Sequence, residues 1–331
     1  MTDSEELTKR CTTILSTIRD EVNKVLIGQE RLVDSLLIAL LTCNRTQGGH
    51  ILLEGVPGLA KTTAVRALSA ALGLDTKRIS FTPDLLPADV IGSLIYNQKD
   101  GSFTPHKGPI FTNLLIADEI NRAPAKVQSA LLEAMQERQV TLGDITYPLP
   151  KPFLVMATQN PIEQEGTYPL PEAQTDRFML KCVVSHPSRE DERRIMQRFT
   201  EPQLPLPKCC ISPDDLRLLL NAIDHVYCDA KVMDYILDIV FATRTPGTFK
   251  GLETLTNAIQ LGASPRATLC LNLAARANAL LRGRTYATPQ DVKEVAHDVL
   301  RHRILLTYEA EAEALTPDRI ISQLLNEIPV P

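Results

Sequence analysis

The sequence contains no tryptophan, and aromatic residues make up only 5% of its 331 residues. It also lacks an excess of positive charge, because 35 lysines and arginines stand against 40 aspartates and glutamates, for a formal net charge of −5. No stretch combines basic residues with aromatic ones. Because binding to nucleic acid is driven by cationic patches and aromatic stacking, both absences argue against a nucleic-acid-binding protein.

Long apolar stretches are absent as well. The longest, residues 36–41, is far shorter than the roughly 20 apolar residues that a membrane-spanning helix needs. The chain starts Met-Thr-Asp-Ser-Glu-Glu, without the basic start and apolar run of a signal peptide. The sequence therefore predicts neither a transmembrane segment nor a secretory leader, and we expect a cytoplasmic protein.

The seven cysteines form no Cys-x-x-Cys pair. Their odd number and irregular spacing indicate free thiols in a reducing compartment, with the adjacent Cys209 and Cys210 as the one pair suited to redox chemistry. The six histidines show no metal-ligand spacing with acids or cysteines. No structural metal site is therefore expected.

What is present is the composition of an ordinary globular protein, with 44% hydrophobic and 23% charged residues, and a length that suggests two domains. Continuous apolar strands alternate with helices in the first part, which is typical of a parallel sheet covered on both faces. The expected strands span residues 50–54, 77–81, 113–118, 153–158 and 178–184. After Val184 only helices are predicted, at residues 189–199, 214–228, 232–243, 266–281 and 289–302. We therefore expect an α/β domain over residues 1–190 and a small all-α domain over residues 191–331.

A glycine-containing loop joins the first expected strand to the next helix and reads Gly55-Val56-Pro57-Gly58-Leu59-Ala60-Lys61-Thr62. It matches the phosphate-loop pattern G-x-x-x-x-G-K-[ST], except that Ala60 replaces the last glycine. The glycines let backbone N–H groups converge on phosphate oxygens, and the positive end of the helix points at the same anion. Lys61 would reach the β- and γ-phosphates, and the Thr62 hydroxyl would bind Mg²⁺.

Ala60 raises a question about the backbone of this loop. A methyl group is tolerated there if the φ angle of the residue is negative, and it destabilises the loop if φ must be positive. The residue types of the loop do not decide the sign.

Two acids, Asp118 and Glu119, stand at the end of the third expected strand. If this strand lies parallel beside the first, Asp118 comes close to Thr62. An aspartate there holds Mg²⁺ through its water shell, and Glu119 polarises a water for attack on the γ-phosphate. Taken alone, such a pair is also a common cap for the following helix.

Three further polar residues each have two interpretations. Asn160 ends the next strand, where its amide could orient the attacking water, but Asn160-Pro161 is also a common loop opener. Arg177 precedes the last strand, and Arg266 opens a helix of the second domain. An arginine beside a γ-phosphate stabilises the charge of the transition state, although a surface or capping role is the ordinary one for both.

Six motifs taken together resemble the MoxR group of AAA+ ATPases, which are ring-forming, chaperone-like P-loop enzymes. They read GVPGLAKT (residues 55–62), ADEINRAP (117–124), LLEAMQE (131–137), ATQNP (157–161), LPEAQTDRF (170–178) and GASPRA (262–267). The resemblance covers about residues 25–305, and Ala60 looks like the usual variant in that group. It implies a P-loop NTPase (AAA+) fold, with a parallel-sheet core followed by a helical lid.

The resemblance also implies roles for individual residues. The matches are Lys61 and Thr62 to the Walker A lysine and threonine, Asp118 and Glu119 to the Walker B acids, Asn160 to sensor 1, Arg177 to the finger given to the neighbouring subunit, and Arg266 to sensor 2 of the lid. Ile27-Gly28-Gln29 resembles the segment that lies against adenine. The implied nucleotide contacts then run through the loop from Gly55 to Thr63.

Further implications of the resemblance concern activity and partners. It implies ATP and Mg²⁺ as ligands, ATP hydrolysis and a homo-oligomeric ring, with a hexamer expected. Residues 90–111 and 138–147 look like the helix-2 insert and the pre-sensor-1 hairpin of this clade, which would carry motion to a client protein. Arg266 would sense the γ-phosphate and change the angle between lid and core. Proteins with von Willebrand factor A domains are implied as partners, and the sequence does not identify the client protein.

Three other functions stay open at this level. A nucleic-acid motor of the helicase or clamp-loader branches shares the loop, the acids and a hairpin, but the charge and the lack of a basic aromatic tract disfavour it. A small-molecule kinase would need an acceptor site in place of a full helical module. An ATP-binding scaffold without turnover would not need Glu119, Asn160 and Arg177 all intact.

Overall fold

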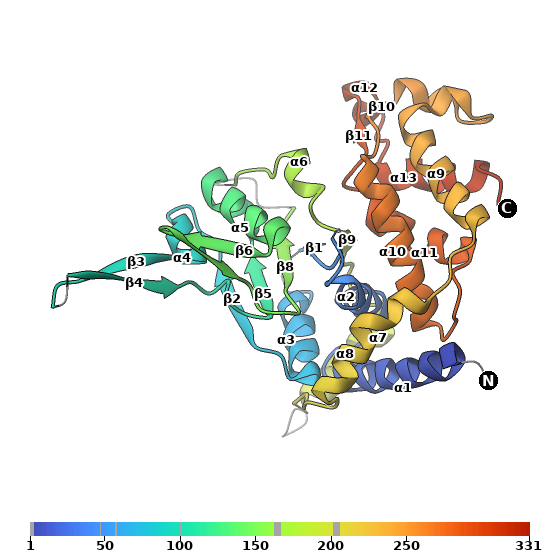
Figure 1. Cartoon of the computed structure of the whole chain (residues 1–331). Helices are drawn as coiled ribbons and strands as arrows, with labels where there is room; N and C mark the ends of the chain where they lie inside the picture. Colours follow the sequence, from blue (N-terminus) through green and yellow to red (C-terminus); the bar gives the residue numbers. More distant parts are fainter. Residues whose placement is uncertain (1–2, 47, 57, 100, 162–166, 201–205) are drawn as a thin grey trace.

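The computed structural model describes residues 3–331 apart from residues 47, 57, 100, 162–166 and 201–205 (Figure 1). Its helices are α1 (Asp3–Asn23), α2 (Glu30–Thr42), α3 (Lys61–Leu72), α4 (Pro87–Ile91), α5 (Ala125–Glu137), α6 (Glu172–Thr175), α7 (Arg189–Phe199), α8 (Pro213–Ala222), α9 (Ala230–Arg244), α10 (Pro265–Leu281), α11 (Pro289–Leu300), α12 (Tyr308–Ala312) and α13 (Pro317–Glu327). Its strands are β1 (Ile51–Glu54), β2 (Thr76–Ser80), β3 (Gly92–Asn97), β4 (Ser102–Lys107), β5 (Leu114–Asp118), β6 (Gln139–Leu142), β7 (Ile145–Pro148), β8 (Leu154–Gln159), β9 (Leu180–Val183), β10 (Ile259–Leu261) and β11 (Leu305–Leu306).

A five-stranded parallel sheet forms the core, in the order β2-β5-β8-β1-β9. All five strands coincide with those predicted from the sequence to within two residues at either end. One expectation about the sheet was wrong, because β5, which carries Asp118, does not lie beside β1. β8 is inserted between them, so the carboxyl ends of three neighbouring strands, rather than two, meet at the loop that follows β1.

Side chains alternate between two apolar clusters, one on each face of the sheet. Leu53, Ile116 and Met156 belong to a cluster that includes α2 and α3, whereas Leu115 and Val155 belong to a cluster that includes α5. β1, β5 and β8 are therefore buried on both sides, as the continuous apolar runs in the sequence predict, whereas the edge strand β2 is largely exposed. The α/β fold with helices on both faces is confirmed.

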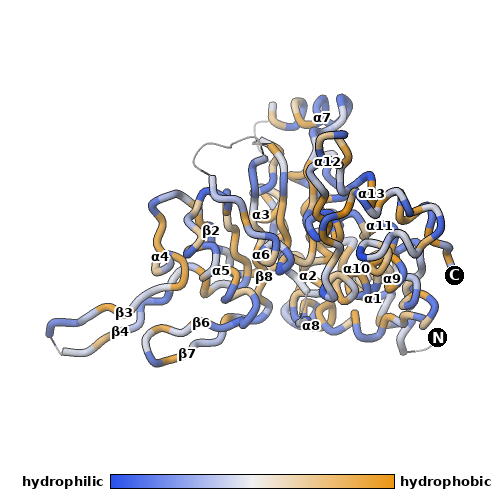
Figure 2. Tube along the Cα trace, turned by 90° about the horizontal axis from the view of Figure 1, so that it is seen from above, coloured by the Kyte–Doolittle hydropathy of each residue, from blue (hydrophilic) through white to orange (hydrophobic). Residues whose placement is uncertain are grey.

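Two β-hairpins project from the core on the same side of the molecule (Figures 1 and 2). β3 and β4 pair antiparallel from Gly92↔Lys107 to Asn97↔Ser102, and β6 pairs with β7. The sequence predicts both hairpins. Gly143, in the turn of the second, approaches Leu94 of the first so closely that an added Cβ atom would lie 2.6 Å from the Leu94 side chain.

The second part of the chain is a helical lid whose helices start at built-in caps. At the start of α8, Ser212 Oγ accepts a hydrogen bond from the Asp215 N–H, and the Ser212 N–H donates back to the Asp215 carboxylate. At the start of α11, the Thr288 N–H and hydroxyl both donate to the Asp291 carboxylate. The helix expected over residues 214–228 ends at Ala222 and continues as a short 3₁₀ turn. Helices α12 and α13 were not predicted.

The expectation that only helices follow Val184 was wrong. β10 and β11 form a two-stranded antiparallel ladder inside the lid, with Ile259 paired to Leu306 and a bulge beside it. Segments of three and two residues are too short to show the alternating pattern by which strands are recognised in a sequence. The ladder is a small addition to a domain that is otherwise helical.

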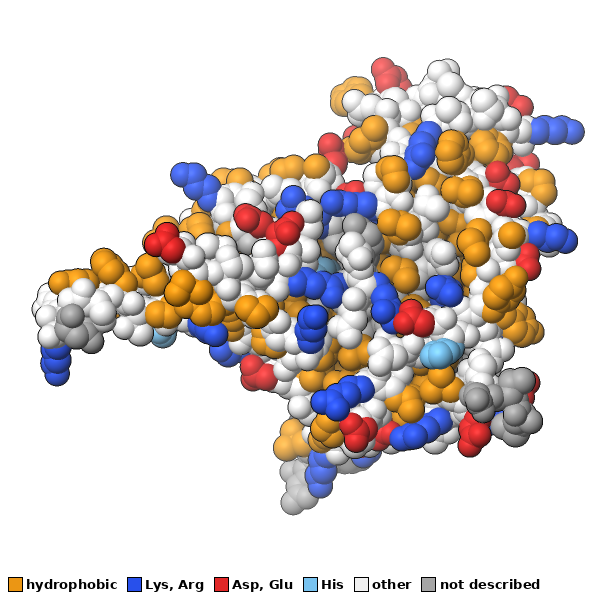
Figure 3. All heavy atoms as spheres, in the orientation of Figure 1, with side chains coloured by type: hydrophobic (Ala, Val, Ile, Leu, Met, Phe, Trp, Pro, Cys, Tyr) orange, Lys and Arg blue, Asp and Glu red, His pale blue; other side chains and the backbone are white. Residues whose placement is uncertain are grey.

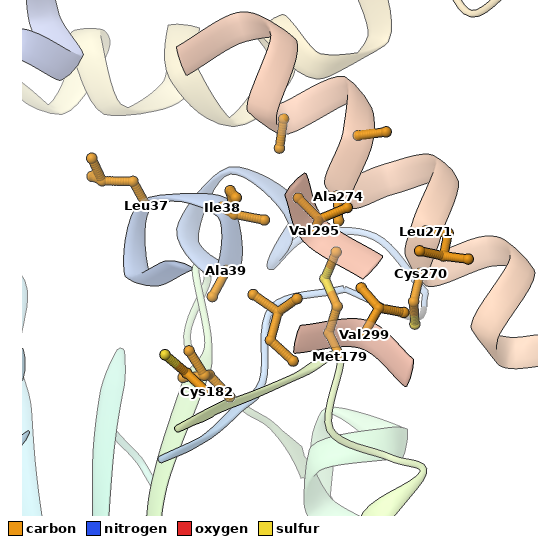
Figure 4. Packing of buried hydrophobic residues seen from close by; sticks show 14 of the residues in the cluster. Leu37, Ile38, Ala39, Met179, Cys182, Cys270, Leu271, Ala274, Val295 and Val299 are labelled. Atoms are coloured by element: carbon orange, nitrogen blue, oxygen red, sulfur yellow. The ribbon is translucent and has the colours of Figure 1, made fainter. Parts of the chain in front are cut away.

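The lid and the core share one hydrophobic cluster (Figure 4). Ile38 and Ala39 of α2 and Met179 beside β9 lie on the side of α10 and α11, which supply Ala274 and Val299 among others. Small residues on α10 let the helices approach closely. The division of the chain at residues 190 and 191 therefore stays a prediction, because no break in packing marks it. Within the described residues, no helix is both long and apolar enough to cross a membrane.

Candidate nucleotide-binding site

The loop between β1 and α3 opens onto a cavity of about 650 Å³ at the carboxyl end of the sheet. The cavity is lined by Val25, Leu26, Ile27, Gln29, Gly58, Leu59, Ala60, Lys61, Thr62, Thr63, Arg78, Ser80, Asp118, Glu119, Thr158, Asn160, Pro187, Ile195 and Phe199. It thus brings together the loop, the ends of β2, β5 and β8, the segment before α2, and α7. Cavities of this size hold ligands as large as a nucleotide.

The structure shows that the φ angle of Ala60 is positive. Ala60 has φ +56° and ψ +21°, in the left-handed region, and Gly58 has φ +85°. A residue with a Cβ atom pays about 1–2 kcal/mol for that conformation, whereas glycine does not. The alanine therefore holds a locally strained loop, which leads directly into α3 at Lys61.

Lys61 is the cation of the cavity that lies nearest the loop. Its Nζ donates a hydrogen bond to the Gly55 carbonyl oxygen. Burial lowers the pKa of Lys61 below its ordinary value, while the carboxylates of Asp118, Glu119 and Glu54 oppose that shift. A half-buried ammonium group facing acids and a loop of backbone N–H groups is suited to bind the phosphates of a nucleotide.

Asp118 forms the polar centre of the cavity floor. The Thr62 hydroxyl lies 3.3 Å from Asp118 Oδ1 and 3.4 Å from Oδ2, and the Thr158 hydroxyl donates to Oδ1 at 3.0 Å. A hydroxyl and a carboxylate at this separation are hard oxygen ligands, which Mg²⁺ prefers, usually with several of its waters retained. These residues therefore fit Mg²⁺, although the described residues contain no cluster of three His, Cys, Asp or Glu side chains.

Arg78 on β2 is a site residue that the sequence did not reveal. Its Nε donates to Asp118 Oδ2 at 2.6 Å, and its Nη2 forms an ion pair with the same oxygen. β2 is the edge strand beside β5, with Ser80 in register with Asp118, so Arg78 projects from the same face two residues earlier. Only the strand order makes this contact visible.

Glu119 is also held in place by its neighbours. Its backbone lies in the left-handed region at φ +57°, and its N–H donates to Thr158 Oγ1 at 2.9 Å. Its carboxylate pairs with Arg122 Nη1 at 3.0 Å. A left-handed non-glycine residue is uncommon and frequently marks a functional site. Thr158 thus ties the two acids together, a role not predicted for it, while Asn160 lines the same cavity and is buried.

Part of the cavity lining is apolar. Leu26, Ile27 and Pro187 line the cavity together with Ile195 and Phe199 of α7. Gly28 does not line the cavity and instead makes room for α7, because a Cβ atom on it would lie 2.6 Å from the Asp191 side chain. Gln29 donates to the Ser185 carbonyl at 3.0 Å. An apolar part beside a cationic loop matches the two halves of a nucleotide.

Arg177 and Arg266 do not line this cavity. Both line a second, much smaller one, together with Thr46, Gly48, His50, Met135, Gln136 and Arg138. Asp176, next to Arg177 in the sequence, contacts the lid at Arg303 Nε (2.8 Å), the Ser264 hydroxyl (2.9 Å) and Arg266 (3.7 Å). The buried Nε of Arg177 has no hydrogen-bond partner among the described residues. Figure 3 shows lysine and arginine side chains gathered where core and lid meet.

The structure therefore brings most, though not all, of the predicted residues together. In the main cavity lie Ile27, Gly58, Leu59, Ala60, Lys61, Thr62, Thr63, Asp118, Glu119 and Asn160. Gly55, Val56 and Gly28 do not line it, and Pro57 falls outside the described residues. Pro187, Ile195 and Phe199 were missed, because apolar side chains far along the chain carry no sequence signal for a ligand.

The chain is similar to known proteins over most of its length. Residues 50–180 match the model of the ATPase family associated with various cellular activities (AAA), and residues 254–324 match the AAA lid domain. Chaperone MoxR1 of Mycobacterium tuberculosis is 50% identical over 94% of this chain and 81% of its own length. Protein MoxR of Paracoccus denitrificans is 34% identical over 94% of each chain. The crystal structure of a presumed ATPase from Cytophaga hutchinsonii has a TM-score of 0.90 and 49% identity, and covers 99% of this chain and 98% of its own.

Proposed function

The chain belongs to the MoxR family of AAA+ ATPases, and from this premise we propose that it binds ATP with Mg²⁺ and hydrolyses it in a ring of identical subunits that remodels client proteins. The observation that carries the proposal is the convergence of Lys61, Thr62, Asp118 and Glu119 on one cavity. Four residues from two separate segments meet there, and each has the chemical character that its proposed role requires.

The contacts in the cavity support a separate role for each residue. Lys61 neutralises the β- and γ-phosphates, and Thr62 with Asp118 would hold Mg²⁺, which supplies further charge neutralisation when bound. Glu119 accepts a hydrogen bond from the attacking water, and the Asn160 amide orients that water. The Thr158 hydroxyl fixes both acids at once, through Asp118 Oδ1 and the Glu119 N–H.

We further propose that two arginines act on the nucleotide of an adjacent subunit. Arg177 and Arg266 share a cavity that is separate from the one containing Lys61. Neither arginine is therefore in the wall of the proposed nucleotide cavity of its own chain. In a ring, one subunit presents one face to the other face of the next, so a heterologous contact can complete each site. This changes the expectation that Arg266 senses the γ-phosphate within its own chain.

The client-binding surface that we propose is the projecting pair of hairpins. Leu94, Ile95, Tyr96 and Phe103 are large apolar residues exposed on the first, and Ile145 is exposed on the second. Figure 3 shows hydrophobic side chains along this projection. Exposed apolar side chains on a projecting element are typical of a surface that binds unfolded or partly folded protein. A hexameric ring, a cytoplasmic location and a partner with a von Willebrand factor A domain belong to the same proposal.

The test compares nucleotide binding with turnover in purified protein. Lys61→Ala is expected to lose binding of Mg·ATP in calorimetry, because it removes the cation that meets the phosphates. Glu119→Gln is expected to bind Mg·ATP like the wild type and to release phosphate at least about a hundredfold more slowly, the usual size of a general-base effect. Lys126→Ala, an exposed lysine on α5, is the control. Unchanged binding in the Lys61→Ala protein would refute the proposal.

A further inference from the structure

Arg78 lines the main cavity, and its guanidinium is engaged there by Asp118. Its guanidinium reaches across from the edge strand and places both Nε and Nη2 on a single oxygen, Asp118 Oδ2. The other oxygen, Oδ1, accepts from Thr158 and is nearest to Thr62. The Asp118 carboxylate is 10% exposed, whereas the Arg78 side chain is 48% exposed. Arg78 therefore has room to leave, and Asp118 does not.

The same carboxylate is the one proposed to hold Mg²⁺ together with Thr62. A guanidinium and a divalent cation at one carboxylate repel each other, and in a partly enclosed site this repulsion is screened less than in water. A buried carboxylate without any cation would be costly as well, because burial of an unpaired charge is strongly unfavourable. Asp118 thus needs a positive partner before the metal arrives and must share or release it afterwards.

We propose that Arg78 is the built-in counter-ion of Asp118, which holds the carboxylate in place in the nucleotide-free site and gives up Oδ2 when Mg²⁺ binds with the nucleotide. This inference rests on the proposed function of the main cavity. It makes Arg78 a positioning residue, which acts on the reaction through Asp118. As a consequence, the loss of the Arg78–Asp118 ion pair offsets part of the free energy of Mg²⁺ binding. Mg²⁺ then enters together with the nucleotide, whose phosphates supply further ligands.

The experiment measures how much Mg²⁺ strengthens nucleotide binding. The dissociation constant of a fluorescent, non-hydrolysable ATP analogue is measured in excess Mg²⁺ and again in EDTA, and the ratio of the two constants is the Mg²⁺ advantage. In Arg78→Gln this ratio is expected to rise about two- to fivefold, the upper part of the range for a partly exposed ion pair. Arg78→Lys, which keeps the charge but loses the Nε donor, is expected to fall between the two. Lys77→Gln removes one charge from the neighbouring, exposed position on β2 and is expected to leave the ratio unchanged.

The outcomes are distinct. A ratio that stays the same or falls in Arg78→Gln overturns the inference, because Arg78 would then be neutral toward the metal or would help to hold it. An equal rise in Lys77→Gln also overturns it, since the effect would be one of general charge. Analogue binding in EDTA tests the main cavity by itself. If the wild type binds no analogue in either buffer, the proposed function fails, and the inference fails with it.

Discussion

Arg266 of the lid and Arg177 of the core line the same small cavity, and neither lines the cavity that contains Lys61. The two arginines are brought together by Asp176, which lies within 3.7 Å of Arg266 and accepts from the buried Arg303. Asp176 directly precedes Arg177 in the sequence, so the lid and the arginine of the core are positioned by one residue. This arrangement makes the dependence of each site on a neighbouring subunit open to test.

The first prediction uses mixtures of two inactive proteins. Lys61→Ala removes the phosphate contact of its own site, and Arg177→Ala removes the residue that we propose for the neighbouring site. Each is expected to lose ATPase activity alone. In a ring mixed one to one, about a quarter of the interfaces would pair an intact Lys61 with an intact Arg177, so phosphate release is expected to recover partly.

The same mixture with Arg266→Ala in place of Arg177→Ala tests the second arginine. Recovery is expected there too, because Arg266 lies in the same cavity. A mixture of Lys61→Ala with Glu119→Gln is the negative control, since both of those residues serve the site of one chain and every site in the mixed ring then lacks one of them. The control mixture is expected to stay inactive, and a mixture of Arg177→Ala with Lys61→Ala that stays inactive as well would contradict the shared site.

The second prediction concerns backbone strain in the phosphate loop. Ala60 and Gly58 both have positive φ angles, and an added Cβ on Gly58 would meet no heavy atom within 4 Å. Ala60→Gly should relieve strain and raise the free energy of unfolding by up to about 1 kcal/mol, net of the greater chain entropy of glycine. Gly58→Ala should lower it by about 1–2 kcal/mol through φ alone.

Urea denaturation of the two variants without nucleotide measures both changes. The pair is informative because the substitutions are reciprocal and lie two residues apart. If Gly58→Ala proved neutral, the left-handed conformation at that position would not be required in solution. A loss of stability in Ala60→Gly would show that the Ala60 methyl group makes a contact worth more than the strain.

How far the sequence predicts this site depends on how local each feature is. The phosphate loop is contiguous, so its residue pattern was enough to place Lys61 and Thr62 at the start of α3. Asp118 was predicted near Thr62 on the wrong premise that their strands are neighbours, and the contact survives because parallel strands end at one edge of the sheet. Arg78 could not be predicted, since its role depends on β2 being the edge strand beside β5.

The position of Arg266 was beyond sequence reasoning for a different reason. The bounds of its helix, α10, were predicted to within one residue at either end. The position of α10, however, depends on how it packs against α2 and the region of β9. Periodicity shows that a helix has an apolar side but not which partner covers it. The sign of the φ angle of Ala60 could not be predicted either, because alanine is compatible with a positive or a negative φ angle.

The third prediction tests the hairpin surface. Tyr96 and Phe103 face each other across β3 and β4 with ring centroids 5.2 Å apart, and they are 53% and 64% exposed. Replacing both with serine is expected to weaken capture of a permanently unfolded model protein at least about fivefold, as truncation of an aromatic anchor does. Basal ATPase activity is expected to stay within about twofold, because neither ring lines the main cavity.

Tyr308→Ser is the matched control, since Tyr308 is 83% exposed on the lid. Capture is measured by fluorescence anisotropy of the labelled model protein in the presence of ATP. Equal capture by the wild type and the double variant would exclude this pair of rings as the contact, whatever the identity of the client.

The fourth prediction concerns His50, which lies immediately before β1 and is 5% exposed. Its Nδ1 accepts from the Val155 N–H at 3.1 Å, and its Nε2 donates to the Met135 carbonyl at 3.2 Å. Both ring nitrogens are thus engaged in the neutral form, and a proton added to Nδ1 would face an N–H group. Burial, aided by the charge of Arg138, lowers the pKa of His50 from 6.5 to about 4.

The sign of the resulting pH dependence follows from these two values. Between about pH 6.5 and 4 the unfolded chain binds a proton at this histidine and the folded protein does not, so the free energy of unfolding falls as the pH is lowered. At about 1.4 kcal/mol per pH unit, His50 accounts for a loss of about 3 kcal/mol across the window. His50→Gln is expected to be less stable than the wild type at pH 7 but to lose less stability on acidification.

Guanidinium denaturation at pH 7, 6 and 5 measures this difference in slope. Burial also lowers the pKa of His302, which shifts the wild type and the variant alike, so the His50 contribution is the difference between the two proteins. His186→Gln, at an exposed position, is expected to follow the wild type. Parallel stability curves for the wild type and His50→Gln from pH 7 to 5 would show that His50 can take up a proton in the folded state, and the two backbone hydrogen bonds would then not hold it neutral.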